Sequence, residues 1–327
     1  MNPRQRVVAA LNHQVPDRTP SFEVWIDGLF AELGVSDPYR AYAELGQDAI
    51  QMPSHTPHSS NAWKDGVDEF GRVWKGGMYF SGMVASADDL QRFTPPLSHA
   101  SEFFDEQQVA DLRKDYPDHC LFFGTHVGPF MGAYMAMGME RMFTLLRQDL
   151  PLVQAVLEAR TGWCIALFQQ AVALGAEVII MGDDSAHRGG TMISPQIWRE
   201  LILPCHQRVV RELPVPVIWH SDGRMEKLLP FAVEAGFAGV HGLEPLAGNR
   251  LDEIKARYGG QLALLGNVDI NLFFQPDLEM IRADVLRSYD QGGSGGYLLS
   301  SCNSIYPGMH PAAVREFFQC QAEFAWR

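Results

Sequence analysis

Four short apolar segments in the second half of the chain each end in a residue that can carry out chemistry. They are VIWHSDG (217–223), AGVHGLEP (238–245), LALLGNVD (262–269) and YLLSSCNS (297–304). Each segment stays apolar until its last residues, where His220, Glu244, Asp269 and Cys302 occur. In a barrel of parallel strands the carboxyl ends all open at one mouth, where catalytic groups gather. The pattern therefore predicts a parallel α/β barrel whose site is assembled from residues distant in sequence.

The whole chain contains eight candidate strands. They fall at 19–26, 48–53, 120–126, 177–182, 215–220, 238–243, 262–267 and 296–301. From residue 177 onward they alternate with helical segments, which is typical of a parallel α/β fold. The prediction is a (β/α)8 TIM barrel. An open doubly wound sheet is the alternative, but no GxGxxG motif follows an N-terminal strand.

The helices carry readable start and stop signals. Asp149 is expected to cap a long helix that ends at Gly175, and Ser194-Pro195 to open a helix over 195–212. Residues 54–118 do not fit the alternation, and FGRVWKGGMYF (70–80) predicts a hairpin around Gly76-Gly77. We expect one domain, residues 1–327, with an insertion at about 54–118 that covers the barrel mouth.

Charge and cysteine usage restrict the classes of partner and compartment. The formal net charge is −13, which disfavours broad binding to nucleic acid or to anionic membranes. The five cysteines show no short-range pairing pattern, and the N-terminal segment reads as an amphipathic helix. No apolar run approaches the ~20 residues of a membrane span. We expect a cytoplasmic protein with free thiols; a homodimer is left open.

His220, Glu244 and Cys302 form a possible metal-binding set, because each follows a strand that opens at the same mouth. A histidine, a carboxylate and a thiolate with an open fourth position suit catalytic zinc. A buried structural role for the histidine is the alternative reading. The strongest local metal motifs, CxxC and HExxH, are absent from the chain.

Acids and aromatic residues at other strand ends are further candidates. Asp183 and Asp184 follow a strand, so one should face the barrel as a general acid while the other acts as a cap or loop carboxylate. The Met-rich stretch 130–143 suits either a broad apolar pocket or ordinary packing in the core. The remaining substrate-binding or polar candidates are Glu23, Trp25, His126, Phe130, Asp269 and Asn303.

Several blocks, taken in order, resemble the uroporphyrinogen decarboxylase superfamily. They are PDRTP (16–20), DDSAHRGGTMISPQIWRELILP (183–204), HSDGRMEKLLPFAVEAGFAGVHGLEP (220–245), LDEIKARYGGQLALLGNVD (251–269) and SSCNSI (300–305). The resemblance implies a (β/α)8 barrel. True decarboxylases of this superfamily carry an arginine-rich segment near the N-terminus, whereas the matching segment here, SFEVWIDGLF (21–30), contains no arginine. Tetrapyrrole decarboxylation is therefore disfavoured, because the substrate carboxylates would lack cationic partners.

The HSDG and LEP segments resemble the zinc- and corrinoid-dependent methyltransferase branch more closely. Members of that branch use an H-x-C pair and a later cysteine as zinc ligands. Here His220 is kept, Asp222 stands at the first cysteine position, and Cys302 lies in the block of the later ligand, where a one-residue slip would place Asn303. Glu244 is the alternative replacement for the missing thiolate.

The resemblance implies methyl transfer between a small methylated substrate and a corrinoid carried by a partner protein. Zn²⁺ held by His220, Cys302 and either Glu244 or Asp222 would activate the heteroatom. Because Asp222 departs from the H-x-C pattern, the resemblance favours an O-methyl donor. Asp183, Asp184 and Glu244 are the expected catalytic acids. Three alternatives stay open: a methyl-corrinoid:thiol methyltransferase, a metal-free decarboxylase-like lyase, and a binding protein without catalysis.

Overall fold

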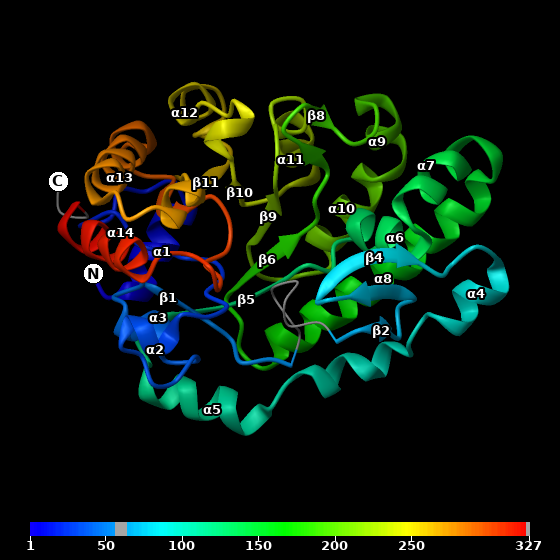
Figure 1. The fold of residues 1–327 in the computed structure, drawn as a ribbon, viewed down its shortest axis with the longest axis horizontal. Helices are drawn as coiled ribbons and strands as arrows, with labels where there is room; N and C mark the ends of the chain where they lie inside the picture. The colour runs from blue at the N-terminus through cyan, green and yellow to red at the C-terminus, as the bar shows by residue number, and fades with distance from the viewer. Residues whose placement is uncertain (56–63, 325–327) are drawn as a thin grey trace.

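A computed structural model of the chain describes residues 1–55 and 64–324, and its centre is a parallel sheet. The described residues place seven strands in the order β1-β5-β6-β9-β10-β11-β12, and every neighbouring pair is parallel (Figure 1). The strands are β1 (Ala49–Gln51), β5 (Cys120–Thr125), β6 (Val178–Gly182), β9 (Val217–Ser221), β10 (Gly239–Gly242), β11 (Ala263–Val268) and β12 (Tyr297–Ser301). Every residue in these strands is buried, as expected for a sheet covered on both faces.

The segment around residues 20–27 lies between the first and last strands of this sheet. On one side it forms isolated parallel bridges from Ser21 to Leu299 and from Ile26 to Ile305. On the other side the N–H of Asp48, just before β1, donates to the carbonyl of Ser21 over 2.8 Å. The segment therefore occupies the eighth strand position and closes the barrel. This confirms the fold class, although the predicted strand 19–26 forms single bridges rather than a continuous strand.

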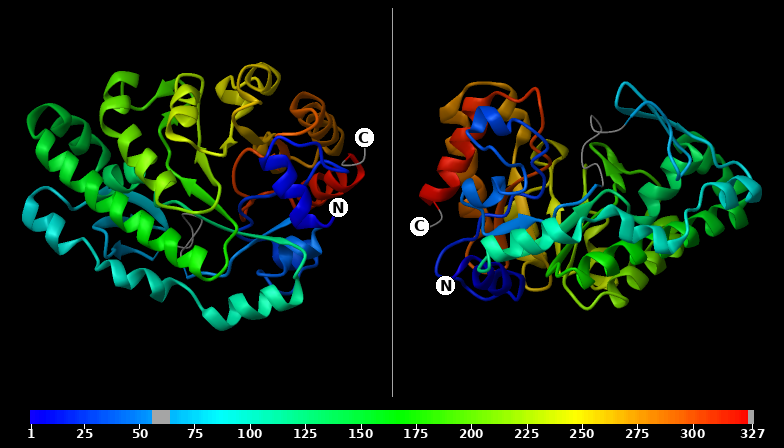
Figure 2. Two further views of the ribbon diagram at one scale, coloured as in Figure 1. Left: turned by 180° about the vertical axis from the view of Figure 1, so that it is seen from behind. Right: turned by 90° about the horizontal axis from the view of Figure 1, so that it is seen from below.

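The helices pack around the outside of the sheet, and both termini lie at the same end of the molecule (Figures 1 and 2). Within the described residues, none of them is long and apolar enough to cross a membrane. The α-helices are α1 (Pro3–Leu11), α2 (Phe30–Leu33), α3 (Ala41–Glu44), α4 (Ala87–Arg92), α5 (Glu106–Asp115), α6 (Pro129–Met137), α7 (Met139–Gln148), α8 (Leu150–Ala173), α9 (Pro195–Leu201), α10 (Leu203–Arg211), α11 (Leu229–Ala235), α12 (Leu251–Tyr258), α13 (Leu278–Gly292) and α14 (Pro311–Phe324). Short 3-10 helices are η2 (Leu97–Phe103), η3 (Pro245–Ala247) and η4 (Ile270–Phe274).

The helix signals in the sequence are mostly confirmed, with one correction. The side chain of Asp149 caps α8 by accepting from the N–H of Leu152, and Gly175 follows the helix with a positive φ. The predicted helix 195–212 is wrong as a single element, because it breaks at Ile202 into α9 and α10. Pro204 lies in the first turn of α10, where its missing N–H is tolerated, whereas inside one continuous helix it would remove a hydrogen bond.

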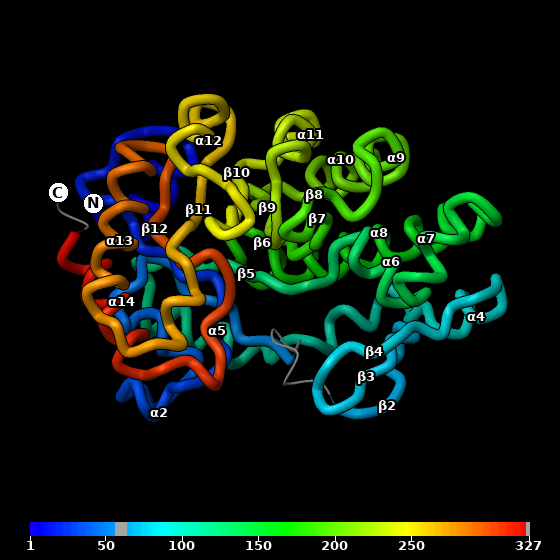
Figure 3. The backbone as a smooth tube through the Cα atoms, turned by 45° about the horizontal axis from the view of Figure 1, so that its top comes forward, coloured from blue at the N-terminus to red at the C-terminus, as the bar shows by residue number. Residues whose placement is uncertain are grey.

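The predicted hairpin around Gly76-Gly77 is present as part of a three-stranded antiparallel sheet. Its strands are β2 (Gly66–Val67), β3 (Arg72–Lys75) and β4 (Met78–Gly82). The hydroxyl of Tyr79 donates to main-chain carbonyls of α6, and Figure 3 shows the sheet beside α6 and away from α12 and α13. Residues 56–63 of the predicted insertion lie outside the described residues, and the boundaries of the insertion stay a prediction.

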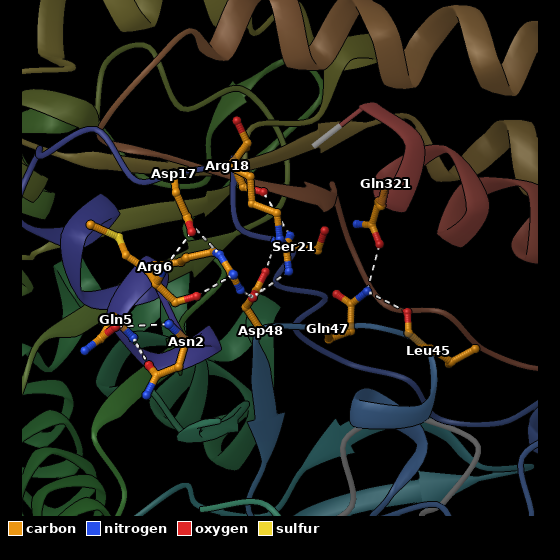
Figure 4. Close-up of polar contacts among 12 residues, drawn as sticks. Asn2, Gln5, Arg6, Asp17, Arg18, Ser21, Leu45, Gln47, Asp48 and Gln321 are labelled. Carbon is orange, nitrogen blue, oxygen red and sulfur yellow. Dashed lines mark hydrogen bonds and ion pairs between the residues drawn. The ribbon is translucent and has the colours of Figure 1, made fainter. Parts of the chain in front are cut away.

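Buried ion pairs fasten the N-terminus to the barrel below β1. The carboxylate of Asp48 is fully buried and accepts from the guanidinium groups of Arg6, at 3.0 Å, and Arg18, at 2.8 Å (Figure 4). Asp17 also pairs with Arg6, at 2.7 Å. Helix α1 is thereby held against the residue that leads into β1, at the end of the sheet opposite the mouth.

Candidate metal site and cavity at the barrel mouth

One histidine and two carboxylates converge at the carboxyl ends of β6 and β9. A potential ligand atom from each of Asp184, His220 and Asp222 lies within 4.8 Å of the other two. The Nε2 atom of His220 is 3.8 Å from Oδ1 of Asp184 and 3.6 Å from Oδ1 of Asp222. The N–H of Asp222 also donates to Asp184, over 3.0 Å, which ties the two loops together. Within the described residues this is the group of three that could hold a metal ion.

The hydrogen bonds of a second histidine determine which nitrogen of His220 faces the carboxylates. Nε2 of His241 lies 3.1 Å from the carbonyl oxygen of Ser301, which can only accept, so this nitrogen carries the proton. Nδ1 of the neutral His241 ring therefore accepts from Nδ1–H of His220, 2.8 Å away. The remaining Nε2 of His220 has no proton, and its lone pair points toward Asp184 and Asp222.

The protonation preferences of four groups at the mouth follow mainly from their removal from water. Burial, reinforced by the neighbouring histidines, holds the pKa of His220 well below its usual range, and burial lowers that of His241 to about 3. Burial also raises the pKa of Asp184 to about 6. Desolvation by the surrounding protein, followed by the Asp184 carboxylate, raises the pKa of Asp222, although 41% of its side chain is exposed at the rim. A nitrogen lone pair facing two carboxylates is poorly satisfied alone and fits a divalent cation such as zinc.

The two adjacent acids after β6 face in different directions. Asp184 points to the mouth, whereas Asp183 is fully buried behind the sheet. The carboxylate of Asp183 accepts from the N–H groups of Phe130 and Met131, at the start of α6, and lies 2.6 Å from Nε2 of His206 on α10. The sequence prediction that only one of the pair faces the barrel thus agrees with the placement of these side chains.

The structure does not bring Cys302 or Glu244 into the three-residue group. Cys302 is 1% exposed, and its thiol lies beside the main chain of Ile270. Asn303, the next residue, reaches the group instead: its Nδ2 donates to Oδ1 of Asp222 over 2.7 Å. Of the predicted ligands His220, Cys302 and either Glu244 or Asp222, the geometric group therefore contains His220 and Asp222, and it adds Asp184.

A cavity of about 500 Å³ opens beside the two carboxylates. Its residues are Tyr134, Met139, Phe143, Asp184, Ala186, His187, Arg188, Met192, Asp222, Gly223 and Glu244. The wall is mainly apolar, and Glu244 forms an ion pair of 2.8 Å with Arg188 across part of it. The cavity is thus a mostly apolar pocket with paired acids at one side, a common form of small-molecule site.

The other predicted site residues divide between the floor of the mouth and the core. The Trp25 ring lies edge-on to His220, with centroids 4.8 Å apart, and contacts His126 at 4.3 Å. Phe130 is fully buried at the start of α6 and is not part of the cavity wall. Glu23 is fully buried and accepts hydrogen bonds from Ser301, and Asp269 caps η4. None of these last three side chains contacts the cavity.

Sequence reasoning missed His241 and Ser301, although a signal for His241 was present. His220 and His241 are register partners on the neighbouring parallel strands β9 and β10. Both occupy the fourth position of their apolar segments, VIWH and AGVH, and strands paired without a register shift place such residues side by side. The carbonyl of Ser301 gave no signal in the sequence, since every residue has one.

Comparisons with known proteins identify the family of the chain. The family model for uroporphyrinogen decarboxylase (URO-D) matches residues 42–324. A methylated-thiol–coenzyme M methyltransferase from Methanosarcina mazei is 30% identical over 167 residues, which are 50% of this chain and 42% of that protein. A uroporphyrinogen decarboxylase from Xanthomonas axonopodis pv. citri is 30% identical over 178 residues, or 50% of this chain and 47% of that one. The chain thus spans less than half the length of either relative.

A solved structure has the same fold. The structure of a methyltransferase from Methanosarcina mazei superposes with a TM-score of 0.80 and covers 99% of both chains, at 19% sequence identity. At this level of identity the similarity concerns the fold, and the chemistry has to be argued from the residues at the mouth.

Proposed function

Since the chain belongs to the uroporphyrinogen decarboxylase family, we propose that it is a methyltransferase of that family. It moves a methyl group between a small O-methylated substrate and a corrinoid carried by a partner protein, with zinc at the barrel mouth. The observation that carries this proposal is the position of Nε2 of His220, 3.8 Å from Asp184 and 3.6 Å from Asp222, beside a mainly apolar cavity.

Each residue of the site has a role in this account. His220, Asp184 and Asp222 would hold the zinc ion, which when bound withdraws electron density from the substrate heteroatom and makes it a better leaving group. Asn303 orients Asp222 through its amide. The apolar wall, including Tyr134 and Phe143, binds the carbon part of the substrate and excludes water.

The rim of the cavity has to serve both the substrate and the approaching partner. The Arg188–Glu244 ion pair lines the cavity, and we assign it to orienting the substrate. The side chain of Asp222 is 41% exposed, so the ligand group is accessible from the solvent side where a partner would present its methyl acceptor. Asp183 has no role in the chemistry here, because its carboxylate is occupied by His206 and the start of α6.

The ligand chemistry supports an oxygen rather than a sulfur heteroatom. Carboxylates are harder and donate less electron density than thiolates, so two of them leave a bound zinc ion more Lewis acidic. Strong Lewis acidity favours the departure of an alkoxide or phenoxide from its methyl group. A thiol substrate is the second candidate, supported by the name of the Methanosarcina mazei relative, a methylated-thiol–coenzyme M methyltransferase.

A decarboxylase activity on a tetrapyrrole is less well supported. Such a substrate presents several carboxylates, which need cationic partners when buried. The arginine of the described cavity wall, Arg188, is already paired with Glu244. The two neighbouring carboxylates Asp184 and Asp222 would further repel an anionic substrate in the absence of a metal.

Methyl transfer to free cobalamin tests the proposal without knowledge of the partner protein. Zinc-loaded enzyme is mixed with Co(I) cobalamin and a methoxylated aromatic compound, methanol or a methylated thiol, and methylcobalamin is followed by its absorption. We expect transfer from an oxygen donor, a transfer rate lowered by about 100-fold or more in His220→Ala, and wild-type rates in His99→Ala, a variant away from the mouth. Transfer only from the thiol would select the second candidate, and no transfer from any donor with zinc bound would contradict both.

A further inference from the structure

We propose that His241 is a positioning residue that sets the metal affinity of this site, as part of a hydrogen-bond network centred on Ser301 at the end of β12. The inference rests on the metal site of the proposed function and adds to it the residues that orient the ligands. Two branches leave Ser301. One reaches His220 through the carbonyl of Ser301 and His241, and the other reaches Asp222 through the hydroxyl oxygen of Ser301 and Asn303.

The histidine branch fixes both the rotation and the tautomer of His220. The Ser301 carbonyl accepts from Nε2–H of His241 at 3.1 Å, and Nδ1 of that ring accepts from Nδ1–H of His220 at 2.8 Å. The opposite neutral tautomers would place the lone pair of His241 Nε2 against the lone pairs of the carbonyl. This arrangement would lose the hydrogen bond between the fully buried His241 and the carbonyl of Ser301, and it is therefore disfavoured.

The asparagine branch holds the second ligand from the same strand end. The hydroxyl proton of Ser301 is directed at Glu23, and the hydroxyl oxygen accepts from the N–H of Asn303 over 3.4 Å. The side chain of Asn303 donates in turn to Oδ1 of Asp222 over 2.7 Å. Oδ1 of Asn303 accepts from the N–H of Ser304 over 2.7 Å, so its amide is fixed at both ends. The buried carboxylate of Glu23 anchors Ser301 itself by accepting from its N–H over 3.0 Å.

Aromatic packing leaves the two histidine rings little room to rotate. The rings of His220 and His241 lie 4.8 Å apart, and the ring of Trp25 stands edge-on to both. Trp25 is fully buried and is held by a hydrogen bond from its Nε1 to the carbonyl of Gly124. Partners of this kind, which orient the ligands of a metal, typically change its affinity by 10–100-fold when they are removed.

The experiment measures zinc affinity by competition with a chromophoric chelator, using metal-free protein. We expect His241→Phe to bind zinc about 10–100-fold more weakly than the wild type. In His241→Asn the side-chain oxygen can accept from Nδ1–H of His220, so we expect this variant to keep most of the wild-type zinc affinity. Visible spectra of the Co²⁺-loaded proteins should show an altered ligand field in the phenylalanine variant and a nearly native one in the asparagine variant.

Thermal unfolding of the metal-free variants separates positioning from folding, and His241→Leu serves as the apolar variant should His241→Phe fail to fold. Wild-type affinity in a folded apolar variant would overturn the inference, as would equal losses in the apolar and asparagine variants. The readout needs no methyl donor. A wild type that binds zinc in a His241-dependent manner but transfers no methyl group would therefore contradict the proposed function and leave the inference standing.

Discussion

At the scale of single residues, the site depends on which way neighbouring side chains face. Asp183 and Asp184 are adjacent, yet Asp183 joins α6 to His206 while Asp184 faces His220. Strand alternation predicted that they would diverge, but not which one would face the mouth. Cys302 and Asn303 follow the end of β12, where regular alternation no longer applies, so the sequence did not determine that the asparagine reaches Asp222.

The two acids should respond differently to truncation. In Asp183→Ala, buried N–H groups of α6 and Nε2 of His206 lose their acceptor, and each buried group left unpaired costs about 1–3 kcal/mol. We expect the free energy of unfolding in urea to fall by about 2–4 kcal/mol. In the metal-free protein, Asp184→Ala should change the free energy of unfolding by less than about 1 kcal/mol. An equal loss of stability in the two variants would show that Asp183 does not have the structural role that separates it from Asp184.

At the scale of elements, most of the architecture follows from local patterns. Seven of the predicted strands and the capped helix α8 are present in the structure. They could be predicted because buried parallel strands are apolar and helix ends carry specific residues. The eighth position is irregular. Pro20 has no N–H for the ladder, and the N–H of Glu23 donates to the side chain of Gln47, 2.7 Å away, instead of to a strand. That contact depends on a residue 24 positions away, which local patterns do not reveal.

The closing segment should make stability depend on pH through Glu23. Burial raises its pKa to about 7 from an ordinary value near 4.5. The folded chain therefore keeps a proton that the unfolded chain has released between these pH values. The stabilising contribution is fully present below pH 4.5 and is lost as the pH rises through about 7.

The corresponding measurement is urea unfolding of wild type and Glu23→Gln between pH 5 and 7. Glutamine does not titrate, so the variant should lack the part of the decline in stability that Glu23 causes. This part is on the order of 3 kcal/mol between the two pKa values of Glu23, about 4.5 and about 7. Glu106→Gln, at an exposed position in the first turn of α5, is the matched control and should keep the wild-type slope. The same slope in all three proteins would show that Glu23 is ionised in the folded barrel at these pH values.

At the scale of the whole molecule, barrel closure brings together residues that local sequence cannot connect. Asp184 follows β6, His220 ends β9, and Ser301 ends β12, and all meet at one mouth because parallel strands open on the same side. The convergence of these side chains at the mouth was therefore predictable from strand ends. The exact members of the group were not, because they depend on loop conformation after each strand and on a second histidine inside β10.

The most direct test of the account is the metal content of the purified protein, measured by elemental mass spectrometry after zinc is supplied. We expect about one zinc ion per chain in the wild type and in Cys302→Ser, because the thiol lies outside the group of His220, Asp184 and Asp222. Zinc should be lost in His220→Ala and in the double variant Asp184→Asn/Asp222→Asn. A wild type without metal, zinc retained in His220→Ala, or zinc lost in Cys302→Ser would each show that these three residues do not form a zinc site.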